Sequence, residues 1–275
     1  MSSLKIHSVQ DIIDSIEGSL LDTLQSRKMG DELEIRLHSR GMFNQGVPYD
    51  VYKNIIDELA SNKDFKKHSA VLETSYDGIL KQKNENEQYD DYGMLIEEPT
   101  GIYPSTIRMT IKDSVLELEK SKSVSYSFIQ KVKRKKVVVK ELNVVVALSS
   151  EKSVKKITKD IFDSKYTISS VRKKMRNSFT FKHWRIDITK VLTANKDVTF
   201  EVEIEYIANQ YYKEALKSAA STGHSLIQKL LKIIQNSKNI MSNSFIEESI
   251  LEYSNLIASS KCGAKLKLRY FVGPL

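Results

Sequence analysis

Two short segments of the chain alternate carboxylates with aliphatic side chains. Residues 31–37 read Asp-Glu-Leu-Glu-Ile-Arg-Leu, and residues 200–206 read Phe-Glu-Val-Glu-Ile-Glu-Tyr. Successive side chains of a β-strand point to opposite faces, so each segment would gather its carboxylates on one face and its apolar side chains on the other. The pattern therefore predicts two amphipathic strands, each with an apolar face and a strongly acidic face.

These acidic faces have two interpretations. Glu32 and Glu34 share a face of the first strand, and Glu201, Glu203 and Glu205 share a face of the second. An acidic face is ordinary on a half-exposed antiparallel sheet, where water solvates the carboxylates. If both strands face one cavity, the five like charges repel each other unless a cation binds among them, which predicts a divalent metal site. The residues alone leave both interpretations open.

The composition is that of a globular protein with a basic excess. The 275 residues are 40% hydrophobic and 28% charged, and no apolar run approaches the length of a membrane-spanning helix, so no membrane association is expected. The formal net charge of +8 favours a polyanionic partner such as RNA, although solvated lysines commonly explain a single basic run. Cys262 is the only cysteine, and no secretory leader is visible, which predicts a cytoplasmic, reducing location.

The hydrophobic periodicity changes twice along the chain. Helical spacing is found at residues 8–28, 48–60, 210–235 and 244–259. Between the second and third helices lie alternating stretches typical of antiparallel strands, at residues 70–73, 106–111, 115–118, 124–131, 137–148, 166–171, 177–181, 185–191 and 198–206. Residues 81–98 are polar and predict a loop. This order predicts an α+β protein built on a closed antiparallel β-barrel of eight or more strands with flanking helices.

Basic residues also alternate in two places. As strands, residues 172–176 would place Arg172, Lys174 and Arg176 on one face, and residues 185–189 would place Arg185 and Asp187 on one face. A barrel lumen with these cations on some strands and carboxylates on others would hold a metal-bound phosphate chain. The run at residues 131–136 predicts instead the basic tip of a hairpin, which could face RNA.

Four motifs together resemble those of the triphosphate tunnel metalloenzymes in order and spacing. They are Glu32-x-Glu34, Arg172-x-Lys174-x-Arg176, Arg185-x-Asp187-x-Thr189 and Glu201-x-Glu203-x-Glu205. Within that superfamily the chain is most similar to metal-dependent RNA 5′-triphosphatases of mRNA capping systems, especially the N-terminal domains of viral and cytoplasmic-plasmid capping enzymes. The resemblance covers residues 30–206 and implies an eight-stranded tunnel.

The resemblance also implies a role for each motif residue. Glu32, Glu34 and Glu205 would bind Mg²⁺ or Mn²⁺ directly, while Glu201 and Glu203 would hold metal-bound waters. The residues implied around the phosphates are Arg108, Arg172, Lys174, Arg176 and Arg185, with Asp187 anchoring the basic strand and Glu151 orienting the attacking water. One position departs from the family pattern, because Val145 stands where a basic residue is often found.

The implied function is removal of the γ-phosphate from 5′-triphosphate RNA, the first step of mRNA capping. A guanylyltransferase, and a methyltransferase, would be partners in the same or another chain, because the nearest match to the Lys-x-Asp-Gly nucleophile motif, Ser75-Tyr76-Asp77-Gly78, lacks the lysine. For a viral enzyme the location would be a virion or viral factory. We expect one domain over residues 1–275: an N-terminal helix (1–29), the barrel (30–206), and C-terminal helices leading into a linker (207–275).

Three other functions remain open from the sequence. A phosphatase for nucleoside triphosphates or polyphosphate would use nearly the same tunnel, as would an adenylate cyclase. A non-catalytic RNA-binding module is the alternative from a different class. Retention of all five carboxylates argues against that module, because an inactive tunnel has no physical reason to keep their repulsion.

Overall fold

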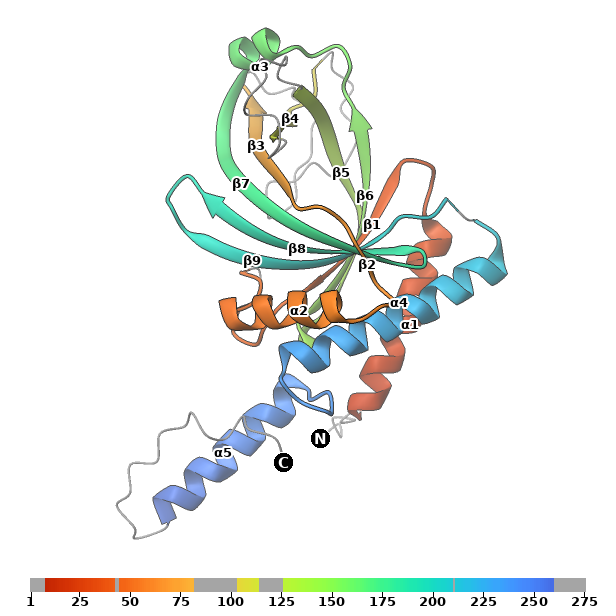
Figure 1. Cartoon of the computed structure of the whole chain (residues 1–275), viewed down its shortest axis with the longest axis vertical. Helices are drawn as coiled ribbons and strands as arrows, with labels where there is room; N and C mark the ends of the chain where they lie inside the picture. The colour runs from red at the N-terminus through yellow and green to blue at the C-terminus, as the bar shows by residue number, and fades with distance from the viewer. Residues whose placement is uncertain (1–7, 43–44, 82–102, 114–125, 210, 260–275) are drawn as a thin grey trace, which may run out of the picture.

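The two acidic segments become neighbouring strands of one closed sheet. A computed structural model describes residues 8–42, 45–81, 103–113, 126–209 and 211–259 (Figure 1). Strand β1 (Asp31–Leu37) pairs antiparallel with β9 (Val198–Tyr206), which sets Glu34 opposite Glu205. The prediction that these carboxylates lie together therefore holds at the level of strand pairing.

The remaining strands complete a barrel. They are β2 (Lys66–Lys67), β3 (Val71–Leu80), β4 (Thr106–Asp113), β5 (Tyr126–Val139), β6 (Val144–Ser153), β7 (Tyr166–Phe181) and β8 (Trp184–Thr193). The sheet order is β2-β7-β3-β4-β5-β6-β1-β9-β8, and a further pairing of β7 with β8 closes it. Since β2 only extends the edge beside β7, eight strands form the ring, and every pairing between them is antiparallel. This confirms the predicted fold class.

The described residues also form five α-helices. They are α1 (Val9–Ser26), α2 (Tyr49–Ser61), α3 (Lys159–Lys165), α4 (Lys213–Ile234) and α5 (Asn243–Ser259). Four of them match predicted helices, and α3 was not predicted because it is only seven residues long. Helix α1 begins with a capping box in which Ser8 and Asp11 exchange side-chain hydrogen bonds with each other's backbone N–H. Within the described chain, no helix is both long enough and apolar enough to cross a membrane.

Several strand predictions were wrong in their bounds. The strands predicted at 166–171 and 177–181 are one strand, β7, which also contains residues 172–176. The strand predicted at 70–73 continues to Leu80. Residues 137–148 are not one strand, because the chain reverses at a single turn of 3-10 helix, Lys140–Leu142. Asn143 ends that turn in the left-handed conformation, with φ of 54°, which asparagine tolerates better than most residues. Valine runs on both sides of the turn conceal it in the sequence. The strand predicted at 115–118 and nearly all of the loop predicted at 81–98 lie outside the described residues.

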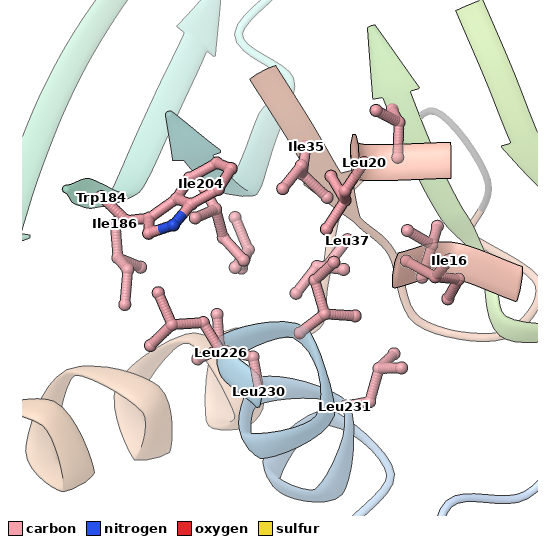
Figure 2. Close-up of a cluster of buried hydrophobic side chains, with 14 of the residues drawn as sticks. Ile16, Leu20, Ile35, Leu37, Trp184, Ile186, Ile204, Leu226, Leu230 and Leu231 are labelled. Atoms are coloured by element: carbon pink, nitrogen blue, oxygen red, sulfur yellow. The ribbon is translucent and has the colours of Figure 1, made fainter. Parts of the chain in front are cut away.

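The main hydrophobic core lies outside the barrel, between one of its walls and the helices. Apolar side chains of β1, β8 and β9 alternate with the charged ones and point outward, where they meet α1 and α4 (Figure 2). Trp184 is fully buried there, and its indole Nε1 donates a hydrogen bond of 3.0 Å to the carbonyl oxygen of Ala219. A Cβ atom added to Gly223 would lie 2.5 Å from Cζ2 of Trp184, so only glycine allows this approach. The core therefore holds the acidic strands from behind.

Candidate tunnel active site

The strand registers turn every predicted site residue toward the lumen. Directly opposed residues of paired strands share a face, and Glu205 stands opposite both Glu34 and Arg185, whereas Glu203 stands opposite Arg36 and Asp187. Continuing around the ring, Thr189 stands opposite Arg176, and Glu73 opposite Lys174. Glu32, Glu151, Arg108, Arg172 and Glu201 occupy the same face of their own strands.

Lys131 sits among three of the carboxylates. Its Nζ atom lies 2.5 Å from Glu32 Oε2, 3.5 Å from Glu34 Oε2 and 3.2 Å from Glu151 Oε1. Burial by itself would lower the pKa of Lys131, but the three carboxylates outweigh it and raise that pKa above its usual value. The ammonium group is therefore a fixed positive charge within the acidic cluster.

This position corrects the prediction that residues 131–136 form a basic hairpin tip. They lie inside β5, where Lys131 is opposite Glu151 and Lys133 is opposite Ser149, and the hairpin turns later, at Lys140–Leu142. A bulge at Arg134 adds one residue to β5, and the pairing of β5 with β6 resumes at Lys135, opposite Leu148. A run of cations resembles a solvated turn in sequence, whereas in the structure its first member, Lys131, contacts the carboxylates of Glu32, Glu34 and Glu151.

A second contact group joins β1 to β9. Arg36 Nε lies 2.5 Å from Glu34 Oε1 and 3.3 Å from Glu203 Oε1. Burial and the charge of Glu34 raise the pKa of Glu203 well above its usual value. Burial would raise the pKa of Glu34 too, but hydrogen bonding to Glu203 and the charges of Arg36 and Lys131 lower it. The pair thus favours a proton on Glu203 and a negative charge on Glu34.

Arg185 and Asp187 connect β9 with β7. Arg185 Nε lies 3.0 Å from Asp187 Oδ2, and its Nη2 contacts Glu205. Asp187 is buried and also accepts a hydrogen bond of 2.6 Å from the hydroxyl of Ser178. Burial, despite the opposing charge of Arg185, raises the pKa of Glu205 to about 7. Asp187 therefore ties together the two strands that carry Arg185 and Arg176.

The opposite side of the lumen is basic and contains two carboxylates that were not predicted as site residues. Asp77 Oδ1 lies 2.7 Å from Arg108 Nε, and Asp77 Oδ2 lies 2.8 Å from Arg172 Nη2. Glu73 Oε1 lies 3.0 Å from Arg176 Nη2. A signal was present, since both carboxylates have the period-2 spacing of one strand face. The predicted strand ends at residue 73, and in the sequence Asp77 stands out only as part of the near match to the guanylyltransferase nucleophile motif.

Two further tunnel residues, Lys174 and Val145, bear on the charge of the lumen. Lys174 is buried, and burial lowers its pKa, an effect that the nearby charges of Arg172 and Arg108 increase and those of Glu201 and Glu203 oppose. Val145 faces the lumen opposite Arg36 and is 4% exposed. Strand β6 therefore supplies no cation at the position where the family pattern often has one, and its charged lumen residue at the far end is Glu151.

The donor set of the acidic wall fits a hard divalent cation. Carboxylate oxygens are the ligands that Mg²⁺ and Mn²⁺ prefer, and Glu32, Glu34 and Glu205 bring them together from β1 and β9. Among the described residues, no three carboxylates, imidazoles or thiols are arranged closely enough to hold an ion as they stand. Lys131, Arg36 and Arg185 contact these carboxylates and balance their charge.

An antiparallel tunnel with carboxylates on one wall and arginines and lysine on the facing wall suits a polyanionic ligand such as a polyphosphate chain. The sequence model of the family described as mRNA capping enzyme, beta chain, matches residues 38–246, so the chain belongs to this family of RNA triphosphatases. It is accordingly a hydrolase that acts as an RNA 5′-triphosphatase in mRNA capping, in a family that is in general metal-dependent.

Similar folds occur among solved structures. The RNA triphosphatase domain of the trifunctional mimivirus mRNA capping enzyme is 16% identical, with 83% of this chain and 98% of that chain covered and a TM-score of 0.49. The S. pombe Pct1 RNA triphosphatase, in complex with the Spt5 CTD, is 14% identical, with 91% and 96% covered and a TM-score of 0.46. A putative adenylate cyclase from Bacillus halodurans is 12% identical, with 74% and 92% covered and a TM-score of 0.37. No curated protein sequence matches the chain.

Proposed function

We propose that the tunnel binds the triphosphate end of RNA with Glu32, Glu34 and Glu205 as ligands of Mg²⁺ or Mn²⁺, and with Glu201 and Glu203 holding its waters. The observation that carries this proposal is the convergence of the carboxylates of β1 and β9 on one wall, where a half-buried cation, Lys131, already lies among them. When bound, the metal ion would neutralise charge on the transferring phosphoryl group.

The chain's own residues supply the other requirements of hydrolysis. Arg108, Lys174 and Arg176 would hold the γ-phosphate oxygens, since guanidinium groups form paired hydrogen bonds with phosphate. Arg172 and Arg185 would hold the neighbouring phosphates, and their carboxylate partners keep them extended into the lumen. Positioned cations of this kind stabilise the charge that spreads over the oxygens in an in-line displacement.

Glu151 is placed to orient the attacking water. It lies on β6 across from Lys131, whose ammonium group holds one of its carboxylate oxygens at 3.2 Å. The second oxygen of a carboxylate held in this way is able to accept a hydrogen bond from water. In this scheme the β-phosphate leaves with the RNA, and inorganic phosphate carries the oxygen of the water.

A guanylyltransferase would then act on the diphosphate end, in the same protein or in a partner, and we expect this in the cytoplasm. The segment that nearly matches the guanylyltransferase nucleophile motif, residues 75–78, supports the assignment of that second activity to another domain or protein. Asp77 belongs to tunnel strand β3 and pairs with Arg108 and Arg172, while Ser75 is buried. No lysine in this segment is available to carry a nucleotide.

The test is release of phosphate from RNA labelled at its γ-phosphate, compared with hydrolysis of free nucleoside triphosphate, with and without Mg²⁺ or Mn²⁺. We expect metal-dependent release from RNA and loss of that release on chelation. Activity that is unchanged by chelation would contradict the metal assignment. Hydrolysis of free nucleotide with no activity on RNA would favour a small-molecule phosphatase.

A further inference from the structure

In the described part of the chain, no helix covers the outer faces of β7, β8 and β9 around Lys173, Lys190 and Val198, beyond the N-terminal end of α2. Strand residues that alternate with the tunnel residues form two rows on this face, in which Lys173 is opposite Leu192, and Lys190 is opposite both Met175 and Phe200. Met175 is 38% exposed and Val198 is 44% exposed, although both lie in the middle or at the start of regular strands. In Figure 1 the β8–β9 hairpin reaches past the N-terminal end of α2.

An aromatic group borders these rows. The ring of Tyr49, the first residue of α2, lies 5.4 Å from the ring of Phe200, and the ring of Tyr52 lies 4.7 Å from Phe200. Tyr52 is buried and receives a hydrogen bond from Asn177, whereas Tyr49 is 63% exposed. Tyr49 therefore presents an aromatic surface that is held in place from behind by two other rings.

The charge of this surface is positive. Lys173 and Lys190 are exposed, lie diagonally across β7 and β8, and have no ion-pair partner among the described residues. Lys53 lies one turn along α2 from Tyr49. Asp50, in the first turn of α2, and Asp197, in the β8–β9 turn, are exposed carboxylates at the margins of the rows. Glu201 and Asp187, which are close to the patch in sequence, lie on the lumen face of their strands.

We propose that single-stranded RNA, the body of the transcript whose 5′ end occupies the tunnel, binds this surface, which we call the outer patch and define as Tyr49, Lys173, Met175, Lys190, Val198 and Phe200. The proposal rests on the function proposed above. Single-stranded nucleic acid is bound elsewhere by this combination, in which aromatic rings stack on bases and lysines contact phosphates.

The position of the outer patch agrees with this occupant. The opposite faces of the same strands carry Lys174, Arg176 and Glu201, so the patch and the tunnel share their strands. Phe200 lies two residues, or roughly 7 Å of strand, from the start of β9 at the hairpin turn, given about 3.3 Å per residue. An RNA that leaves the lumen at this end needs only a few nucleotides to pass around the hairpin and reach Tyr49.

The experiment measures binding of a single-stranded RNA of about 20 nucleotides with a 5′-hydroxyl end, by fluorescence anisotropy over a series of salt concentrations. The variants are Tyr49→Ala and the double variant Lys173→Gln, Lys190→Gln. A matched control is Lys155→Gln, Lys156→Gln, two exposed lysines in the turn after β6 that lose the same charge. This probe has no triphosphate, so its binding does not depend on the proposed hydrolysis.

We expect Tyr49→Ala to weaken RNA binding at least about five-fold, because one stacked base is lost. The patch double variant should reduce the slope of log affinity against log salt by up to about 1.4, which is two contacts of about 0.7 each. The control should change neither quantity. For 5′-triphosphate RNA, the patch variants should raise KM without changing kcat or the hydrolysis of free nucleoside triphosphate.

Unchanged RNA affinity in the patch variants would overturn the proposal and leave a protein partner as the occupant of the apolar rows. An equal loss in the control would overturn it too, because the effect would then come from net charge. If 5′-hydroxyl RNA binds through the patch while triphosphate RNA is not hydrolysed, only the proposed function fails.

Discussion

The wall formed by β1, β8 and β9 and the wall formed by β3, β4 and β5 differ in what lies behind them. The first carries the carboxylates and packs against α1, α2 and α4 through the main hydrophobic core. The second, with Arg108 and Asp77, is backed by a cluster of six buried residues around α3, namely Ile107, Met109, Phe128, Ile157, Phe162 and Tyr166. The two walls thus receive unequal support from apolar burial.

Charged side chains inside the lumen contribute on both walls. Carboxylates on neighbouring strands repel each other; Arg36, Arg185 and Lys131 offset part of this repulsion, and burial of the outward apolar side chains of the same strands adds a further favourable contribution. On the basic wall, Glu73 and Asp77 lie in the lumen beside Arg176, Arg108 and Arg172 and balance their charge locally. Both walls are thus balanced in charge from inside the barrel, and the acidic wall also packs against the larger hydrophobic core outside it.

Loss of a carboxylate from the well-supported wall should have the largest effect on activity. We expect Glu34→Ala to abolish phosphate release from triphosphate RNA while the protein stays folded, because the outward Leu33 and Ile35 remain buried. Phosphate release at saturating metal and thermal unfolding check this, with the exposed Glu248→Ala as control. A variant that keeps more than about a tenth of the activity would exclude Glu34 as a metal ligand.

The same truncation on the two walls tests their support directly. Ile204 and Ile107 both point outward beside a tunnel residue and are 0% and 3% exposed. We expect Ile204→Ala to lower the free energy of unfolding by about 4 kcal/mol and Ile107→Ala by about 2 kcal/mol, since the smaller cluster can relax around the cavity. Urea denaturation measures both. Equal losses would show that the walls are supported alike.

Lys131 is the cation that the basic side contributes to the acidic wall. In the absence of metal, Lys131→Met removes the ammonium group that lies among Glu32, Glu34 and Glu151. We expect this to lower the free energy of unfolding by about 2 kcal/mol. Added Mg²⁺ should restore more stability to this variant than to the wild type, because it would replace the missing charge. Unfolding curves with and without Mg²⁺ test this, beside Lys155→Met. No loss without metal would mean that the carboxylates do not need the ammonium group.

The smallest expected effect is on the geometry of phosphate binding. Arg176→Lys keeps the charge near Glu73 but loses the planar pair of donors, so we expect about a tenfold fall in kcat/KM for triphosphate RNA. Steady-state kinetics, with the exposed Lys217→Arg on α4 as control, measure it. A wild-type rate would imply that the guanidinium group of Arg176 does not hold phosphate.

The sequence alone determined the faces of the strands and the order of the elements. A period of two assigns each side chain to one face, because the strand backbone alternates regardless of its neighbours. For this reason Glu32, Glu34, Glu201, Glu203 and Glu205 were placed correctly on one side of their strands, and the long helices were found from their period of 3.6.

Only the tertiary structure decided which charges meet. The period of a strand says nothing about its neighbour or register, so the contact of Lys131 with Glu32 depends on where the chain reverses at Asn143. The pairing of Asp77 with Arg108 and Arg172 likewise required β3 to lie between β4 and β7. These contacts join strands that are distant in sequence, and closure of the barrel between β7 and β8 brings them around one lumen.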